Sequence, residues 1–153
     1  MREMAAARPS EVLMVEDNPG DVRLAMEALR EGVVAKQVHV VEDGVEAMRF
    51  LHQRQRSAGG RLPDIILLDL NLPKKDGHEV LAEIRADEQL QRAVVIIFTS
   101  SSAEQDVRRA YELHAKCFVT KPSGFAELID IIKKIETFWL TVVTLPCRGG
   151  ADR

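Results

Sequence analysis

Four short apolar runs in this sequence are each followed by polar residues that could take part in chemistry. The residues after these runs are an acidic pair, a single aspartate, a threonine and a lysine: Glu16-Asp17, Asp69, Thr99 and Lys121. Strands buried in a parallel sheet have continuous apolar sequences, and ligands bind outside the carboxyl ends of such strands. The pattern therefore predicts that these five side chains gather at one edge of a single sheet.

These residue types together suit phosphoryl transfer. Carboxylates held close together repel one another, and Mg²⁺, which prefers oxygen ligands, relieves that repulsion. Lys121 adds a fixed positive charge, and the hydroxyl of Thr99 can donate to a phosphoryl oxygen. We expect Asp69 to be the nucleophile that accepts the phosphoryl group, because the apolar run 65–68 ends at it. The alternative is that Asp69 is a solvated residue that closes a strand.

The apolar periodicity predicts the elements that must position these residues. Strands are expected at 11–15, 37–41, 65–69, 94–98 and 116–120, each followed by a helical pattern. Asn18 and Pro19 mark the start of the first helix, and Gly32 marks its end. Residues 54–63 are expected to be a surface loop, and Ser102 a cap of the fourth helix. Five strand–helix pairs predict an α/β fold, a doubly wound five-stranded parallel sheet of the flavodoxin-like type.

Length and composition exclude several other classes. The 153 residues fit one globular domain, and a net charge of −3 argues against nucleic acid as a partner. No apolar stretch is long enough to span a membrane, and residues 1–10 lack the apolar core of a signal peptide. A short N-terminal tail on a cytoplasmic protein is therefore expected. Cys117, Cys147 and the four histidines lack metal-ligand spacing and are expected to be surface or packing residues.

The set Glu16-Asp17, Asp69, Thr99 and Lys121-Pro122 resembles the receiver domain of two-component response regulators. The resemblance covers about residues 11–135. It implies that Asp69 takes a phosphoryl group from a phosphohistidine on a sensor histidine kinase. It also implies that the protein is a signalling protein rather than an enzyme, although it assists its own phosphorylation and dephosphorylation.

The resemblance further implies a Mg²⁺ site. Asp17 and Asp69 would bind the ion through their side chains, and Asn71 through its backbone carbonyl. Glu16 would hold a metal-bound water. The peptide bond between Lys121 and the following proline is implied to be cis, an arrangement that proline tolerates.

A conformational switch is also implied. In receivers the hydroxyl that matches Thr99 moves toward the phosphoryl group, and the aromatic ring that matches Phe118 then turns inward. Many receivers have tyrosine at the latter position, so any polar contact of its hydroxyl is lost with Phe118. The alternative is that Phe118 is an ordinary core residue of the fifth strand.

A finer resemblance, to stand-alone regulators paired with phytochrome-type kinases, rests on three segments, 16–21, 69–77 and 138–146. The expected organisation is therefore an N-terminal tail (1–10), a receiver domain (11–137) and a C-terminal extension (138–153). Such a protein would signal through protein–protein contacts. No segment after the receiver is long enough for a helix-turn-helix domain.

Three alternatives to the receiver interpretation exist. A P-loop nucleotidase requires a Gly-x-x-x-x-Gly-Lys-Ser/Thr motif, which the sequence lacks. A phosphatase of the dehalogenase type would have a second aspartate at the position of Asn71. The remaining alternative is a receiver-like module that docks onto partners without being phosphorylated.

The last helix and the extension predict a homodimer. On a helical wheel Leu128, Ile132, Ile135 and Trp139 form one stripe that the sheet should cover. Ile131 and Phe138 fall to one side of this stripe, and we expect them to form an interface between two copies together with Trp139 and Val142. The alternative is that the extension folds back onto its own domain.

Overall fold

The computed structural model describes residues 9–32 and 36–137. All five expected strands are present: β1 (Ser10–Val15), β2 (Lys36–Val41), β3 (Ile65–Leu68), β4 (Val95–Thr99) and β5 (Cys117–Thr120). They form one parallel sheet in the order β2-β1-β3-β4-β5. Because the chain moves from β1 to β2 on one side and then to β3 on the other, the switch point of the sheet lies beside β1. The predicted doubly wound fold is confirmed.

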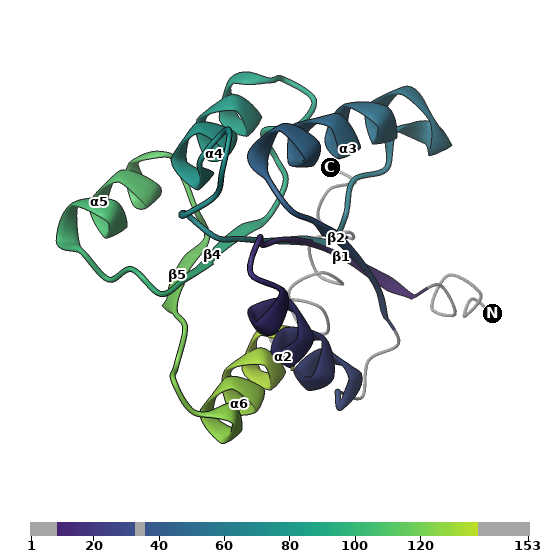
Figure 1. The fold of residues 1–153 in the computed structure, drawn as a ribbon. Helices are drawn as coiled ribbons and strands as arrows, with labels where there is room; N and C mark the ends of the chain where they lie inside the picture. Colours follow the sequence, from purple (N-terminus) through teal and green to yellow (C-terminus); the bar gives the residue numbers. More distant parts are fainter. Residues whose placement is uncertain (1–8, 33–35, 138–153) are drawn as a thin grey trace.

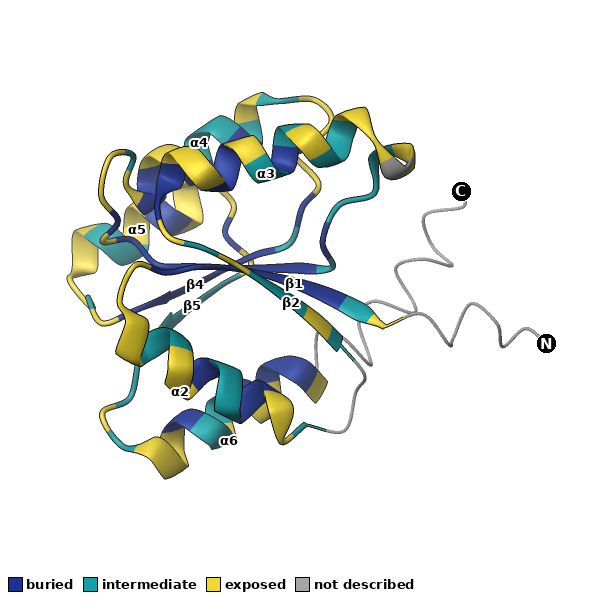
Figure 2. Ribbon diagram, turned by 45° about the vertical axis from the view of Figure 1, so that its right-hand side comes forward, coloured by how far each residue is buried: buried dark blue, intermediate teal, exposed yellow. Residues whose placement is uncertain are grey.

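Helices cover both faces of the sheet (Figure 1). The helices α2 (Pro19–Arg30) and α6 (Phe125–Ile135) lie on one face, and α3 (Gly44–Arg56), α4 (Gly77–Ala86) and α5 (Glu104–Glu112) lie on the other. Figure 2 shows that the central strands are almost entirely buried between the two helical layers. None of the helices within residues 9–32 and 36–137 is long and apolar enough to cross a membrane.

The start of α2 follows from its sequence as predicted. The side chain of Asn18 accepts a hydrogen bond from the backbone N–H of Asp21, and Pro19 occupies the first turn. The helix ends at Arg30, two residues before Gly32. This first turn matters for the site, because it projects from the carboxyl end of β1.

Two local predictions were wrong. Helix α3 continues to Arg56, and a 3₁₀ turn (Ala58–Gly60) occupies part of the segment 54–63 that was expected to be a surface loop. The helix persists because its last turns carry side chains that bind the underlying sheet, as described below. Ser102 does not cap α5, since the N-cap position is Ala103 and no side chain hydrogen-bonds the start of the helix there.

Helix α6 buries the stripe that the helical wheel predicted, as far as it lies in the described residues. Leu128, Ile132 and Ile135 are buried against the sheet, and Ile131 is half-buried at the border of the same core. The other interface candidates, Phe138, Trp139 and Val142, lie outside the described residues.

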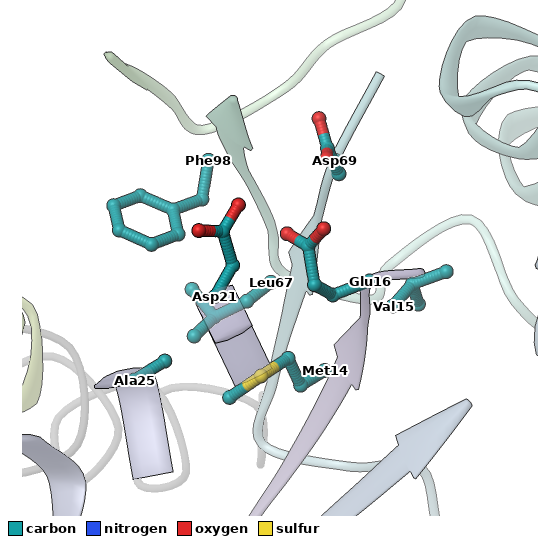
Figure 3. A pocket seen from close by; sticks show the side chains of 8 residues that line it. All are labelled: Met14, Val15, Glu16, Asp21, Ala25, Leu67, Asp69 and Phe98. Carbon is teal, nitrogen blue, oxygen red and sulfur yellow. The ribbon is translucent and has the colours of Figure 1, made fainter. Parts of the chain in front are cut away.

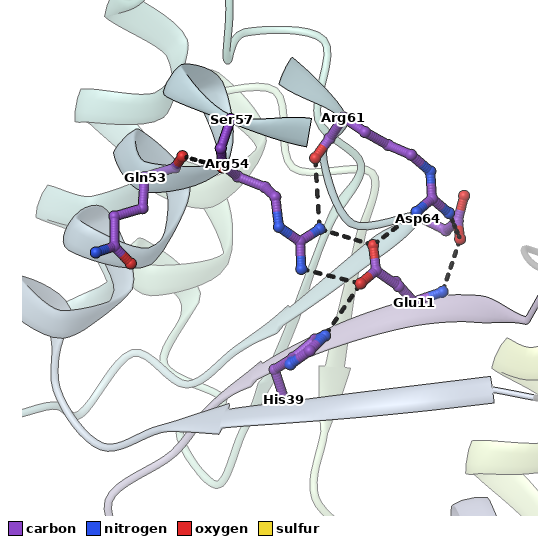
Figure 4. Close-up of polar contacts among 7 residues, drawn as sticks. All are labelled: Glu11, His39, Gln53, Arg54, Ser57, Arg61 and Asp64. Carbon is purple, nitrogen blue, oxygen red and sulfur yellow. Dashed lines mark hydrogen bonds and ion pairs between the residues drawn. The ribbon is translucent and has the colours of Figure 1, made fainter. Parts of the chain in front are cut away.

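A buried ionic network at the opposite end of β1 ties the sheet to α3 (Figure 4). Glu11 is only 5% exposed, and its carboxylate accepts two hydrogen bonds from Arg54, at 2.7 and 2.9 Å. Arg61 and His39 contribute further contacts to the same carboxylate, each at 3.1 Å. The backbone N–H of Glu11 donates to Asp64 at 2.7 Å. This network explains why α3 extends past residue 53.

We expect Glu11→Gln to lower the free energy of unfolding by about 2–4 kcal/mol, because it leaves the partly buried Arg54 without its counter-charge and Arg61 with only the more distant Asp64. Hydrogen bonding by Arg54 lowers the pKa of Glu11 below 4.5 against the opposing effect of burial. The stabilisation is therefore present above pH 4.5 and is lost as the pH falls further. Urea denaturation of the unmodified protein and of Glu11→Gln between pH 3 and pH 7 measures this difference in the free energy of unfolding.

The control is Glu27→Gln, which removes an exposed ion pair with Arg30 and should change stability by less than about 0.5 kcal/mol. Equal stability of Glu11→Gln and the unmodified protein would show that the network contributes nothing net.

Candidate functional site

The strand register brings the predicted polar residues to one edge of the sheet. Val15 pairs with Leu68, and the N–H of Asp69 donates to the carbonyl of Val15 at 3.1 Å. On the other side of β3, Leu68 pairs with Ile97, so that Thr99 ends β4 at the same edge. Residues Glu16, Asp69, Thr99 and Lys121 thus lie at the carboxyl ends of four neighbouring strands. This edge includes the switch point, where open α/β sheets bind ligands.

Asp69 is held firmly at the end of β3. Its side chain is buried, with one oxygen accepting from the N–H of Asn71 at 3.3 Å and the other from Lys121 at 3.2 Å. The start of α4 presses against its backbone, because a Cβ on Gly77 would lie 2.3 Å from the carbonyl oxygen of Asp69. Only glycine allows this approach, so Gly77 fixes the distance between α4 and Asp69.

Lys121 is surrounded by three carboxylates. Its ammonium donates to Glu16 at 2.5 Å, to Asp21 at 2.9 Å and to Asp69 at 3.2 Å. These partners use all three N–H groups of the ammonium. Burial opposes the charged form, but the hydrogen bonds with Glu16 and Asp21 outweigh it and raise the pKa of Lys121. Lys121 is therefore a permanently charged group in fixed position.

Asp21 is a site residue that the sequence analysis missed. In the sequence it stands three positions after the cap Asn18, in the first turn of the helix. The structure shows that this turn faces the carboxyl end of β5, which brings Asp21 to Lys121 across 100 positions of sequence. The sequence signal for it is its position in the first turn of a helix that starts directly after the acidic pair Glu16-Asp17.

Carboxylates dominate the charge of this site. Oxygen atoms of Glu16, Asp17 and Asp69 lie within 4.8 Å of one another, with Asp17 exposed and the other two buried. Together with Asp21 they place four acidic groups around one lysine. Burial and the negative charge of Asp69 raise the pKa of Glu16 to about 7, although the lysine opposes this. Hard oxygen ligands with excess negative charge suit a divalent cation such as Mg²⁺.

A small cavity of about 10 Å³ lies beneath this cluster (Figure 3). The carboxylates of Glu16, Asp21 and Asp69 are turned toward the same space, and Met14 and Phe98 form part of its apolar wall. The volume is about that of one water molecule, so the space beneath the carboxylates is not a binding site for an organic ligand. Any larger group must approach from the solvent side of the edge.

Thr99 ends β4 and Phe118 lies in β5, as expected, but within the described residues no hydrogen bond links either side chain to Asp69. Thr99 is fully buried, and its hydroxyl accepts a long hydrogen bond from the N–H of Ser101 at 3.4 Å. Within the described part of the chain no hydrogen bond joins the hydroxyl of Thr99 to Asp69 or to the ammonium of Lys121. Phe118 is half-buried at the border of the core, and its N–H donates to the hydroxyl of Tyr111 at 3.2 Å.

The peptide bond between Lys121 and Pro122 differs from what the resemblance implied. All peptide bonds within the described residues are trans, this one included. The N–H of Lys121 donates to the carbonyl of Thr99 at 2.7 Å, which continues the pairing of β5 with β4 beyond the strand end. This pairing places Lys121 at the site.

Comparisons with known proteins agree with this geometry. The model of the response regulator receiver domain matches residues 12–133. The response regulator Rcp1 of Synechocystis sp. is 44% identical over 138 residues, covering 90% of this chain and 94% of the relative. A probable methanogenesis regulatory protein, FilR2 of Methanothrix harundinacea, is 38% identical, covering 90% of this chain and 88% of the relative.

Solved structures show the same relationship. The phosphorylated cyanobacterial phytochrome response regulator RcpA superimposes with a TM-score of 0.81 at 46% identity, covering 88% of this chain and 96% of that one. The Mn²⁺-bound form of Rcp1 gives a TM-score of 0.79 at 42% identity, with the same coverage of both chains. The fold is therefore shared with response regulators. This chain therefore belongs to the response regulator receiver domain family.

Proposed function

We propose that this protein accepts a phosphoryl group on Asp69 from the phosphohistidine of a sensor histidine kinase. The observation that carries the proposal is the environment of Asp69. Its buried carboxylate accepts a hydrogen bond from Lys121 and lies next to the acidic pair Glu16 and Asp17. One oxygen of Asp69 attacks the phosphorus, and the bond from phosphorus to the histidine nitrogen breaks. The products are an acyl phosphate on Asp69 and a histidine without its phosphoryl group.

The surrounding residues supply charge and position rather than covalent chemistry. Lys121 neutralises negative charge on the phosphoryl oxygens and holds Asp69 in place. The carboxylates of Asp17 and Asp69, with the backbone carbonyl of Asn71, would hold Mg²⁺, and Glu16 would accept from a metal-bound water. The bound ion would balance the charge that gathers during transfer. Thr99 would donate to the phosphoryl group after a movement of its loop, and Phe118 would follow it.

The proposed upstream partner is a kinase of the phytochrome type, and the proposed output is a set of protein–protein contacts made in the cytoplasm. Support for the partner comes from RcpA, which is named as a cyanobacterial phytochrome response regulator. FilR2 is named for a different process, so the receiver itself does not determine the stimulus. A screen of phosphotransfer from purified kinases identifies the partner directly.

The alternative function is docking without phosphorylation, and Asp69→Asn separates the two. The change is nearly isosteric but removes the nucleophile, so we expect no acid-labile phosphate after incubation with acetyl phosphate and Mg²⁺. The thermal midpoint should change little. Asp130→Asn, which alters an exposed acid of α6, is the control and should be labelled like the unmodified protein. Undiminished labelling of Asp69→Asn would refute the assignment of the nucleophile.

The metal site predicts a pH-dependent affinity for Mg²⁺. Glu16 must be ionised to accept from a metal-bound water, and burial raises its pKa to about 7. Protons therefore compete with the ion below pH 7, and calorimetric titration should show about tenfold weaker binding at pH 6 than at pH 8. Asp17→Ala should remove the binding at both pH values, whereas Asp130→Asn should not. An affinity that is independent of pH would exclude Glu16 from the site.

We also propose that the protein is a homodimer through α6 and the C-terminal extension, with Ile131, Phe138, Trp139 and Val142 at the interface. Large aromatic residues are the expected anchors of such a surface. Light scattering on a sizing column should give about 34 kDa, twice the chain mass of 17.1 kDa. Phe138→Ala combined with Trp139→Ala should give a folded monomer. Phe125→Ala, at the exposed other end of α6, is the matched control and should remain dimeric.

A further inference from the structure

A short chain of polar contacts joins three elements beside the site without involving the carboxylate cluster. The hydroxyl of Ser101, in the loop after β4, donates to Oδ2 of Asp106 at 2.6 Å. Oδ1 of Asp106, in the first turn of α5, lies 3.3 Å from Nε2 of His78, in the first turn of α4. These three residues, called the latch below, connect the loop to both helices on one face of the sheet (Figure 1).

His78 is a buried histidine, and its side chain makes its polar contact with Asp106. Its side chain is 7% exposed, and Nδ1 is buried without a hydrogen-bond partner in the described part of the chain. A buried imidazole is costly unless it is hydrogen-bonded, so the contact of Nε2 with Asp106 has to offset that cost. An apolar side chain would fill the same space more cheaply. The presence of histidine here therefore points to the polar contact rather than to packing.

Both ends of the latch reach the proposed phosphorylation site. At one end, the N–H of Ser101 donates to the hydroxyl of Thr99. At the other, His78 directly follows Gly77, whose N–H donates to the carbonyl of Leu70 at 3.0 Å and whose Cα packs on the backbone of Asp69. The latch therefore joins the segment that carries the nucleophile to the loop that carries the switch hydroxyl.

The start of α5 also depends on this contact. No side chain caps the helix, and Asp106 instead reaches back from its first turn to Ser101. The hydrogen bond from Ser101 lowers the pKa of Asp106 against burial, and His78 acts in the same direction. An ionised carboxylate accepts stronger hydrogen bonds than a neutral group does. The position of Ser101 is thus fixed by α5, not by the loop alone.

We propose that His78 and Asp106 are positioning residues that hold Ser101, and through it the hydroxyl of Thr99, in the unphosphorylated arrangement. This inference rests on the proposed function. In this structure the hydroxyl of Thr99 accepts from the N–H of Ser101, and within the described residues it has no hydrogen bond to Asp69. In the proposed function it donates to a phosphoryl group there after a movement of its loop. A contact that exists only before this movement stabilises the unphosphorylated form, and its loss shifts the population toward the phosphorylated arrangement.

Two variants of His78 test the proposal. His78→Leu fills the space but removes the contact with Asp106, whereas His78→Gln keeps an N–H donor near the position of Nε2. The probe is beryllium fluoride, a phosphoryl mimic, titrated with Mg²⁺ present. His78→Leu should bind it about two- to tenfold more tightly than the unmodified protein, the range expected for one hydrogen bond. His78→Gln should restore affinity close to the original value.

Hydrogen exchange of the unphosphorylated protein tests the latch itself. The amides of Asp106 and Val107, which donate to the carbonyl of Ala103 at 3.0 and 3.1 Å, should exchange faster in His78→Leu. Glu104→Gln is the control on the same helix, because it removes only an exposed ion pair with Arg108. It should change neither exchange nor affinity.

Affinity in His78→Leu that equals or falls below the original would overturn the proposal. If that variant does not fold, Ser101→Ala breaks the other contact of the latch and should give the same tightening. Where both fold, the double variant should add nothing to the larger single effect, because the two changes break one chain of contacts. Failure of the unmodified protein to bind beryllium fluoride would refute the proposed function instead, and the exchange rates would still decide the latch.

Discussion

Four carboxylates and one ammonium share the carboxyl edge of this sheet, and this unequal charge governs the site. Lys121 can satisfy Glu16, Asp21 and Asp69 only by using every proton it has, which leaves a net negative charge in a partly buried place. The excess favours the binding of a divalent cation. The repulsion among these carboxylates also requires rigid strand ends, because like charges remain close only where the backbone fixes their positions.

A buried glutamate lies at each end of strand β1, Glu11 at the start and Glu16 directly after the last residue. The charges around each glutamate determine its pKa and its role. Glu11 is met by Arg54 and Arg61, its pKa is lowered, and it serves to join the sheet to α3. Glu16 has one lysine and an acidic neighbour, and burial raises its pKa. The carboxylate of Glu11, whose charge is neutralised by arginines, stabilises the fold. The carboxylate of Glu16, which lies among excess negative charge, is suited to binding a cation.

The two helical layers have different relations to this edge. On one face, α2 contributes Asp21 directly to the cluster and packs beside α6, from which the C-terminal extension continues. On the other face, α4 and α5 meet through His78 and Asp106, next to the loop of Thr99. A phosphoryl group on Asp69, as proposed, would therefore add negative charge next to groups from both helical layers.

The sequence by itself determined the strands, the parallel fold and the gathering of Glu16, Asp17, Asp69, Thr99 and Lys121 at one edge. Apolar runs and caps encode which backbone segments are buried and where they end, and strand ends in a parallel sheet meet by construction. Contacts between charged side chains on different elements were decided only by the tertiary structure: Asp21 with Lys121, Glu11 with Arg54, and His78 with Asp106. Helix periodicity does not encode them, because each depends on how a helix is rotated and placed against the sheet.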